Sequence, residues 1–550
     1  MVPGRNSMEI IIAKFSHWWP PLKKGTPATL RAIFFFLVLF LAAYISSLCL
    51  DTSAFLSIKN EPVPTNVEVV LVRPENLTKL EEPRTPLPAK LQTLPERVLE
   101  FPAIDCSGAD ERKNQTRTCP DRGKEPTWEP ARGSRGECPS YFRWIHEDLK
   151  PWKASGITRE MVEGGRGSAN FRLVIKKGRV YVEKFRKSIQ SRDKFTIWGI
   201  LQLLRKYPGK IPDLELMFDC EDKPVIRPEK YSAEAAALPP LFRYCGDRRT
   251  VDVVFPDWSF WGWAEINIRP WDKLQKEMKE GNKIIKWEER EPYAYWKGNP
   301  FVADTRKDLL TCNVSDRHDW GARIFIQVNL LDWFKESQQG FKESSLAKQC
   351  KHRYKIYIEG YAWSVSEKYI LACDSITFMV KPYYYDFFTR SLEPLVHYWP
   401  INDRDKCRSI EYGVQWGNQN PEKAQAIGRA ASELIQEKVS MDYVYDYMFH
   451  LLNEYGKLLR FEPQVPAASV EVCSEGMACS GGGEDVLGLG LERKFMLESL
   501  VKSPSLSRPC EIGHPFESQE LEKYYKRNLN TIRRVQKWES QYWQDFEKQG

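Results

Sequence analysis

The sequence predicts an α/β fold of two lobes around a cleft. Short apolar segments typical of strands alternate with longer segments of helical periodicity, and this alternation favours mostly parallel sheets. The alternation covers roughly 320 residues, which is more than one domain of ordinary size and so predicts two lobes. The chain has 550 residues, of which 42% are hydrophobic and 28% charged. This composition is typical of globular proteins and excludes a disordered, collagen-like or multi-span membrane protein.

The first elements are a hairpin, a helix and a strand. Residues 171–183 (FRLVIKKGRVYVE) predict two short strands joined at Lys177-Gly178. Residues 195–206 predict a helix, because their apolar residues recur at helical spacing. Residues 213–218 (DLELMF) predict a strand that ends at Asp219.

Further segments of both kinds continue the alternation. Strands are predicted at 251–255, 323–327, 354–358 and 376–380. Helices are predicted near 272–280, 302–311, 364–372, 421–438 and 440–461. A charged segment with periodic aromatic residues, 517–549, predicts an exposed helix that packs on the body.

The N-terminal region predicts a membrane anchor. Residues 32–50 carry no charge and approach the roughly 20 residues that a helix needs to cross a bilayer. Basic residues outnumber acidic ones before them, which places residues 1–31 in the cytosol and the rest in the lumen. A cleaved signal peptide is the alternative. The Pro-rich, charged residues 51–137 predict a stem, residues 138–465 the catalytic body, and residues 466–550 a C-terminal extension with a charged helix.

Two further features favour the secretory pathway. N-glycosylation sequons occur at Asn76, Asn114 and Asn313. Apart from Cys49 in the apolar run, twelve of the 13 cysteines remain, and none has zinc-ligand spacing. An even number of cysteines in an oxidising compartment predicts disulfides. Cys106 with Cys119 and Cys350 with Cys373 are plausible local bridges, although spacing alone fixes no pairing.

The candidate catalytic acids lie at 211–224 (IPDLELMFDCEDKP). Asp219, Glu221 and Asp222 follow a predicted strand, and strand ends in α/β folds face the ligand crevice. Two chemistries compete. In one, the acids bind a divalent ion that holds a nucleotide diphosphate; in the other, one carboxylate is a general base that takes a proton from an acceptor hydroxyl. A solvated acidic turn is the structural alternative.

A candidate phosphate site follows at 293–308 (YAYWKGNPFVADTRKD). A predicted strand runs into the turn Lys297-Gly298-Asn299, and a helix beyond it carries Arg306. A Gly turn before a helix offers backbone N–H groups to an anion, and the two cations add positive charge. This pattern suits a diphosphate leaving group, although strand–Gly–helix joins are also common without a ligand.

The aromatic segment 255–271 (FPDWSFWGWAEINIRPW) is a candidate sugar or acceptor platform. Its central rings are Trp258, Phe260 and Trp261. A core hairpin is the alternative explanation. Other functions lack support: no GxSxG, HExxH, Walker or GxGxxG motif occurs, and a net charge of +7 over this length is too weak to indicate nucleic-acid binding.

These motifs together resemble glycosyltransferase family 90, the Rumi-like protein O-glucosyltransferases and their fungal and plant relatives. The similarity covers roughly 138–465 and rests on HEDLKPW, IPDLELMFDCEDKP, FPDWSFWGW, AYWKGN, CKHRYKIYIEGYAWSVSEKYILACDS and LEPLVHYWP in this order. The segment EGYAWSVSEKYILACDS resembles the plant branch. The resemblance implies a GT-B type fold of two Rossmann-like lobes, inverting transfer from a UDP-sugar, and no required metal or other cofactor.

The resemblance also implies roles for single residues. It makes Asp222 the general base, while Asp219 stands where the animal enzymes have Asn. It matches the family's UDP-sugar-binding turn and downstream Arg to Lys297, Gly298, Asn299 and Arg306. It matches the family's disulfide to Cys350 and Cys373.

One departure from the family concerns the diphosphate. The animal enzymes carry Arg-Phe-Lys after the Gly that matches Gly360, whereas this chain has Ser366-Glu367-Lys368. One diphosphate contact is therefore lost, or it passes to Lys368.

The expected protein is thus a type II membrane glycosyltransferase of the Golgi, with the endoplasmic reticulum as the alternative location. It moves glucose or xylose from a UDP-sugar to a protein or polysaccharide hydroxyl. Its partners are the donor, a glycan or glycoprotein acceptor and the membrane, but no nucleic acid. Two alternatives stay open: a metal-dependent transferase using Asp219 and Glu221, or an inactive glycan-binding scaffold.

Overall fold

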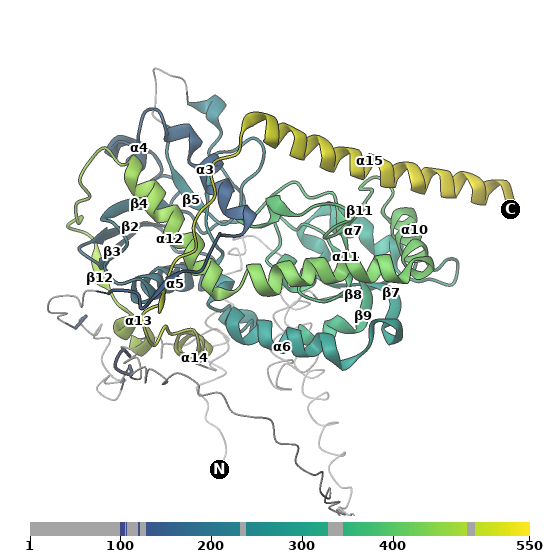
Figure 1. Ribbon diagram of the computed structural model, residues 1–550, viewed down its shortest axis with the longest axis horizontal. Coiled ribbons are helices and arrows are strands. Elements are labelled where there is room, and N and C mark those ends of the chain that lie inside the picture. The colour runs from purple at the N-terminus through teal and green to yellow at the C-terminus, as the bar shows by residue number, and fades with distance from the viewer. Residues whose placement is uncertain are drawn as a thin grey trace, which may run out of the picture. The chain divides into compact units, whose positions relative to one another are not determined.

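The computed structural model describes residues 100–104, 106, 119–120, 128–231, 238–327, 345–480 and 490–549 (Figure 1). The expected cytosolic tail, the apolar run 32–50, most of the stem, and the sequons at Asn76 and Asn114 lie outside these residues. Among the helices of the described residues, none has the length and apolar character to cross a bilayer.

The first sheet is mixed. Its six strands follow the order β12-β3-β2-β4-β5-β6, with β4, β5 and β6 parallel to one another and β2, β3 and β12 joined by antiparallel pairing. The bounds are β2 Phe171–Lys176, β3 Arg179–Lys184, β4 Leu214–Phe218, β5 Leu241–Arg243, β6 Val253–Val254 and β12 Val470–Val472. The expectation of a mostly parallel sheet is wrong here. The predicted hairpin turn, with positive φ at Lys177 and Gly178, forces the strands on either side of it to be antiparallel.

The second sheet is entirely parallel, as predicted. Its five strands follow the order β11-β10-β9-β7-β8. Their bounds are β7 Glu291–Gly298, β8 Ala322–Ile326, β9 His352–Tyr357, β10 Ile376–Val380 and β11 Trp399–Ile401. Because all strands run in one direction, their carboxyl ends share one edge, where ligands of α/β proteins bind.

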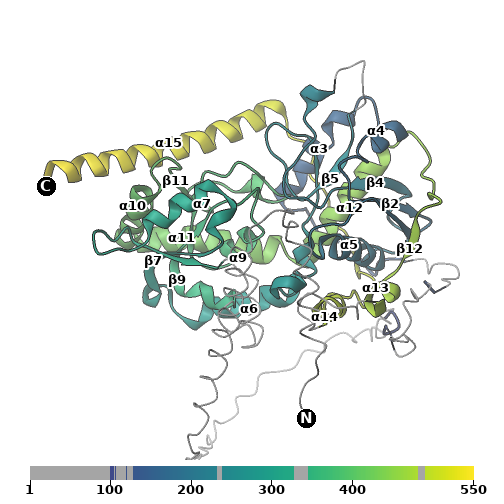
Figure 2. The same cartoon turned by 180° about the vertical axis from the view of Figure 1, so that it is seen from behind.

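Helices cover both sheets, so the predicted α/β class is confirmed. In Figures 1 and 2, α5 and α12 accompany the first sheet, and α10 and α11 the second. Apolar residues of α5 and α12 join the core of the first sheet, and those of α10 and α11 contribute to the separate core of the second. The helices are α3 Trp144–Asp148, α4 Arg159–Gly164, α5 Arg192–Lys206, α6 Trp271–Ile284, α7 Asp304–Leu309, α9 Glu367–Leu371, α10 Lys406–Gln419, α11 Pro421–Glu433, α12 Met441–Leu458, α13 Ser474–Ser480, α14 Leu491–Glu498 and α15 Ser518–Gln549. Of these, α4, α10, α13 and α14 were not predicted.

The C-terminal region is joined to the body by pairing and by disulfides. Strand β12 extends the first sheet, and β1 Arg132–Ser134 pairs with β13 Ser507–Arg508. The predicted Cys106–Cys119 bridge is wrong. The chain returns along the first sheet at β12 and α13, so it offers each of these cysteines a different partner. The five bridges are Cys106–Cys479, Cys119–Cys473, Cys138–Cys510, Cys312–Cys407 and, as predicted, Cys350–Cys373.

The predicted C-terminal helix α15 packs on α10, which lies beside the second sheet. The Ser409 hydroxyl donates to Glu539 Oε2 at 2.9 Å, and Val535 is buried in the core of the second sheet. Burial raises the pKa of Glu539 to about 7, with Asp405 raising it further and Arg408 opposing the shift. The packed helix therefore carries a carboxyl group that prefers its neutral form.

This preference predicts that packing of α15 depends on pH. The raised pKa favours the packed state fully below about pH 4.5, and this contribution is lost as the pH rises through about 7. We expect hydrogen exchange within residues 518–549, corrected for intrinsic rates, to show less protection above pH 7 than at pH 5. Glu539→Gln, which stays neutral, should remove the difference, whereas Glu547→Gln at an exposed site should keep it. An unchanged difference in Glu539→Gln would contradict the assignment.

Candidate active site

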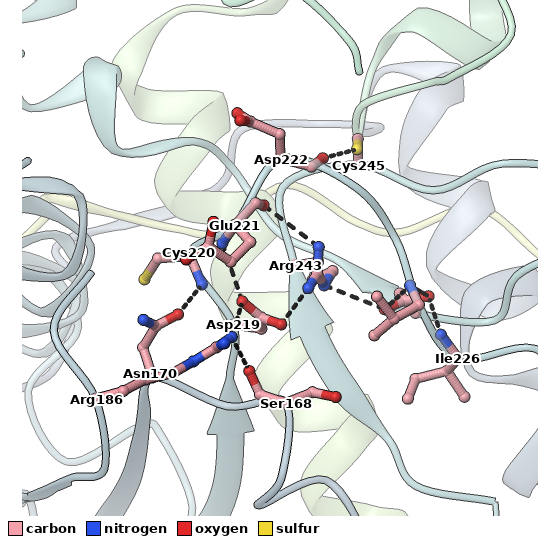
Figure 3. Close-up of polar contacts among 12 residues, drawn as sticks. Ser168, Asn170, Arg186, Asp219, Cys220, Glu221, Asp222, Ile226, Arg243 and Cys245 are labelled. Atoms are coloured by element: carbon pink, nitrogen blue, oxygen red, sulfur yellow. Dashed lines mark hydrogen bonds and ion pairs between the residues drawn. The ribbon is translucent and has the colours of Figure 1, made fainter. Parts of the chain in front are cut away.

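The acids after β4 divide into a buried and an open carboxylate. Asp219 is fully buried and accepts hydrogen bonds from Arg243 Nη2, from Arg186 Nη2 at 3.0 Å and from the backbone N–H of Glu221 at 3.0 Å (Figure 3). Two guanidinium groups already neutralise this carboxylate, so its surroundings do not suit a divalent cation. Asp219 therefore fixes the backbone of the acidic turn.

Asp222 is the open carboxylate. Its side chain is 29% exposed, and Figure 3 shows it directed away from Asp219. Arg192 Nη1 donates to Asp222 Oδ1 at 3.0 Å and to the Cys220 carbonyl at 3.0 Å, while its guanidinium lies 4.4 Å from the Trp258 ring centroid. One oxygen is thus held, and the other can accept a proton from an incoming hydroxyl.

The loop that carries Asp222 contacts the segment after β9. The Cys245 thiol donates to the Asp222 carbonyl at 3.1 Å, and its sulfur also interacts with the Trp363 backbone. The Lys223 ammonium lies 3.8 Å from the centroid of the Tyr361 ring. These contacts bring the candidate base beside the loop that extends from the second sheet.

A cavity of about 640 Å³ lies where β7 and β9 end. This volume is within the range of small-molecule sites. Its wall includes the predicted donor-binding residues, together with two hydroxyls of the loop after β9: Lys297, Gly298, Asn299, Arg306, Ser364 and Ser366. The structure therefore brings the end of β7 and the downstream arginine into one site. The predicted turn is wrong in part, because Lys297 and Gly298 are the last residues of β7 and pair with β8, and only Asn299 follows the strand.

Arg306 holds the two loops of this site together. Its Nη1 donates to the Asn299 carbonyl at 3.2 Å, its Nε to the Glu359 carbonyl at 3.0 Å, and its Nη2 to the Ile358 carbonyl at 2.9 Å and Ser364 Oγ at 3.3 Å. One Nη1 hydrogen remains for a ligand. Burial lowers the pKa of Arg306 and raises that of the neighbouring Glu359 to about 7.

Lys368 does not line this cavity. Its ammonium is buried and donates to Asp257 Oδ2 and Ser259 Oγ, both at 2.8 Å. This placement does not fit the expected diphosphate contact, because a buried carboxylate already takes the charge. Asp257 was not predicted, and no local signal could have identified it, since its partner Lys368 lies 111 residues away.

The predicted aromatic platform is wrong. Trp258, Phe260 and Trp261 are at most 1% exposed and belong to the core of the first sheet. Trp261 also packs so closely on Gly199 that a Cβ there would meet its ring at 2.5 Å. The next aromatic residue, Trp263, lines the cavity instead.

Two other predicted features have a defined place. Asn313, the sequon asparagine in the described part of the chain, is half-buried, and its Oδ1 accepts from Ile324 N–H at 2.9 Å. Within the described ranges, a group with metal-ligand spacing consists of Cys138, Cys510 and His450. Its two cysteines form a disulfide and are not free thiolates.

The chain is similar to known proteins. The sequence model of Glycosyl transferase family 90 matches residues 133–539. The chain is similar to the O-glucosyltransferase rumi of Drosophila melanogaster, with 24% identity over 59% of this chain and 79% of the relative. It is similar to the rumi homolog of Anopheles gambiae, with 26% identity over 61% and 82%. It is also similar to Protein O-glucosyltransferase 1 of Homo sapiens, with 26% identity over 60% and 82%.

Proposed function

Because the chain belongs to glycosyltransferase family 90, we propose that it is an inverting enzyme that moves a sugar from UDP to a hydroxyl of a protein or polysaccharide acceptor. The observation that supports this most directly is the open carboxylate of Asp222 at the end of β4. Its loop contacts the segment after β9, and the cavity at the end of β7 and β9 lies along that same segment. We also propose that the two sheets are the two lobes of a GT-B type fold.

The proposed step is a single displacement. The acceptor oxygen attacks the anomeric carbon while Asp222 takes the acceptor proton, so that the glycosidic bond forms with inversion. The bond from the anomeric carbon to the UDP oxygen breaks, and UDP leaves with its electron pair. Backbone N–H groups beyond the end of β7 and the charges of Lys297 and Arg306 stabilise the negative charge that develops on the diphosphate.

Glucose is the first donor to test, since the names of the relatives are those of O-glucosyltransferases. UDP-xylose lacks only a hydroxymethyl group, so both donors belong in the panel with UDP-galactose and UDP-glucuronate. Release of UDP from one of them by residues 52–550 would support a transferase and identify its sugar. A second candidate is a glycan-binding scaffold, which Ser366 in place of the expected Arg favours. UDP binding without turnover, even with acceptors present, would support it.

Metal independence is the next part of the proposal. Arg186 and Arg243 hold the carboxylate that a metal-dependent mechanism would need, Asp219. We therefore expect UDP release to be unchanged, within about twofold, after EDTA treatment and desalting. Added Mg²⁺ or Mn²⁺ should likewise have little effect. Loss of activity with EDTA and its recovery with either ion would contradict this expectation.

We propose a Golgi location with residues 32–50 as a retained anchor and the catalytic region in the lumen. The five disulfides of the described residues support an oxidising compartment. Protease protection in sealed microsomes tests the topology. A catalytic region that is digested without detergent would contradict a lumenal location, and microscopy with organelle markers separates the Golgi from the endoplasmic reticulum.

A further inference from the structure

Lys355 is a buried lysine in the wall of the donor cavity. It lies on β9, opposite Tyr295 of β7, and lines the same 640 Å³ cavity as Lys297 and Arg306. Its side chain is 2% exposed. The proposed mechanism gives it no role.

No carboxylate pairs with Lys355 among the residues that the structure describes. The contact of its ammonium is with Cys373 Sγ, at 3.4 Å, and a disulfide sulfur is a weak acceptor. Two other buried cations of the described residues pair with carboxylates, Lys368 with Asp257 and Arg390 with Asp148. Two more, Arg290 and Arg306, donate to backbone carbonyls. Lys355 thus differs from buried cations with a purely structural role.

The surroundings of Lys355 carry additional positive charge. Arg290, in the segment before β7, adds an unfavourable charge, and burial and this cation together lower the pKa of Lys355 to about 7. Glu277 of α6 lines the cavity, but it is already paired with Arg269. A buried ammonium without a counter-ion is costly, and an anion entering the cavity would remove that cost.

We propose that Lys355 is a further anion-binding residue of this site and contacts the diphosphate of the bound UDP-sugar. The inference rests on the proposed function, because it assumes that the cavity takes a nucleoside diphosphate sugar. It adds Lys355, a cation in the interior of the sheet, to Lys297 and Arg306 as donor-binding residues. The residues at the end of β7 and Lys355 would then hold the diphosphate from two sides.

The test is calorimetric titration of residues 52–550 with UDP-glucose at pH 8. The difference between the heats measured in two buffers of different ionisation enthalpy gives the number of protons taken up on binding. The diphosphate of UDP-glucose does not titrate near this pH, so it contributes no protons to this number. Since the free Lys355 is mostly neutral at pH 8, the wild-type protein should take up close to one proton per UDP-glucose. Lys355→Met should take up none and bind about 10- to 100-fold more weakly, as expected for loss of a charge-assisted hydrogen bond.

Matched controls separate this role from a structural one. Lys276→Met, at an exposed lysine of α6 that pairs with Asp272, should leave affinity and proton uptake unchanged. If Lys355→Met does not fold, Lys355→Gln keeps a polar end without a charge and carries the same two expectations. Lower thermal stability of Lys355→Met with unchanged affinity and proton uptake would overturn the proposal.

The outcomes also separate this inference from the proposed function. Equal binding and equal proton uptake by wild type and Lys355→Met would overturn the role of Lys355 and leave the transferase intact. Failure of the folded wild-type protein to bind UDP-glucose, UDP-xylose or UDP itself would overturn the proposed function and this inference with it. Weaker binding of the variant together with lost proton uptake would support both.

Discussion

Replacing Asp222 with Asn is expected to leave the fold intact and to reduce sugar transfer by about 10²–10⁴-fold, the usual contribution of a positioned general base. The amide has nearly the same shape as the carboxylate, and its oxygen can still accept from Arg192 Nη1. It cannot take a proton from the acceptor. The expected loss is therefore in kcat, measured as transfer or UDP release under saturating donor.

Binding of the donor gives the control for this experiment. Asp222 is not part of the wall of the 640 Å³ cavity, so the affinity of Asp222→Asn for UDP should equal that of the wild type. Glu221→Gln, the adjacent half-buried acid, should change turnover by less than about threefold. A well-folded Asp222→Asn protein with normal turnover would show that another group takes the proton, and a low-activity Glu221→Gln would point to that neighbour.

Local patterns in the sequence predicted local structure well. The hairpin at Lys177-Gly178 was predictable because few residue types adopt the backbone conformation of its turn. Strands β7 and β9 were predictable because each contains at least three apolar or aromatic residues within a short segment. The Cys350–Cys373 bridge closes a short segment and was also predicted. In each case the interacting residues are close in the sequence.

Long-range partners could not be predicted in the same way. Cys106 and Cys119 pair with cysteines that are 373 and 354 residues away, and this pairing depends on the C-terminal region returning to the first sheet. The roles of Asp219 and Lys368 were unclear for the same reason. The role of Asp219 depends on its buried counter-ion Arg243, and that of Lys368 on Asp257. Both counter-ions come from a different part of the chain.

The aromatic segment 255–271 differs from its prediction because its central rings are buried. Trp258, Phe260 and Trp261 have the composition of a sugar platform, but the same rings fill a core equally well. Residue type gives no information about which surface covers a ring. Tyr361 is exposed and Trp263 lines the cavity, and only the folded chain distinguishes these aromatic residues from the buried ones.

Arg306 is the position where one substitution should affect both donor binding and stability. Arg306→Met removes the donors to three backbone carbonyls, those of Asn299, Ile358 and Glu359. A buried group left without its partner costs about 1–3 kcal/mol, so for three carbonyls we expect a loss of about 3–9 kcal/mol in the stability of this region. The loops at the ends of β7 and β9 should then separate, and UDP affinity should fall by at least about 10-fold.

The two effects can be measured separately and compared with near neighbours. Thermal denaturation and hydrogen exchange of the loop after β9 report stability, and UDP titration reports the site. Lys307→Met, at an exposed lysine that pairs with Asp304 in the same helix, should change neither. Arg306→Lys keeps the charge but not the fork of donors, so it should recover part of the UDP affinity and little of the stability. Full recovery of stability by lysine would show that charge, and not the hydrogen bonds to the two loops, is what this position supplies.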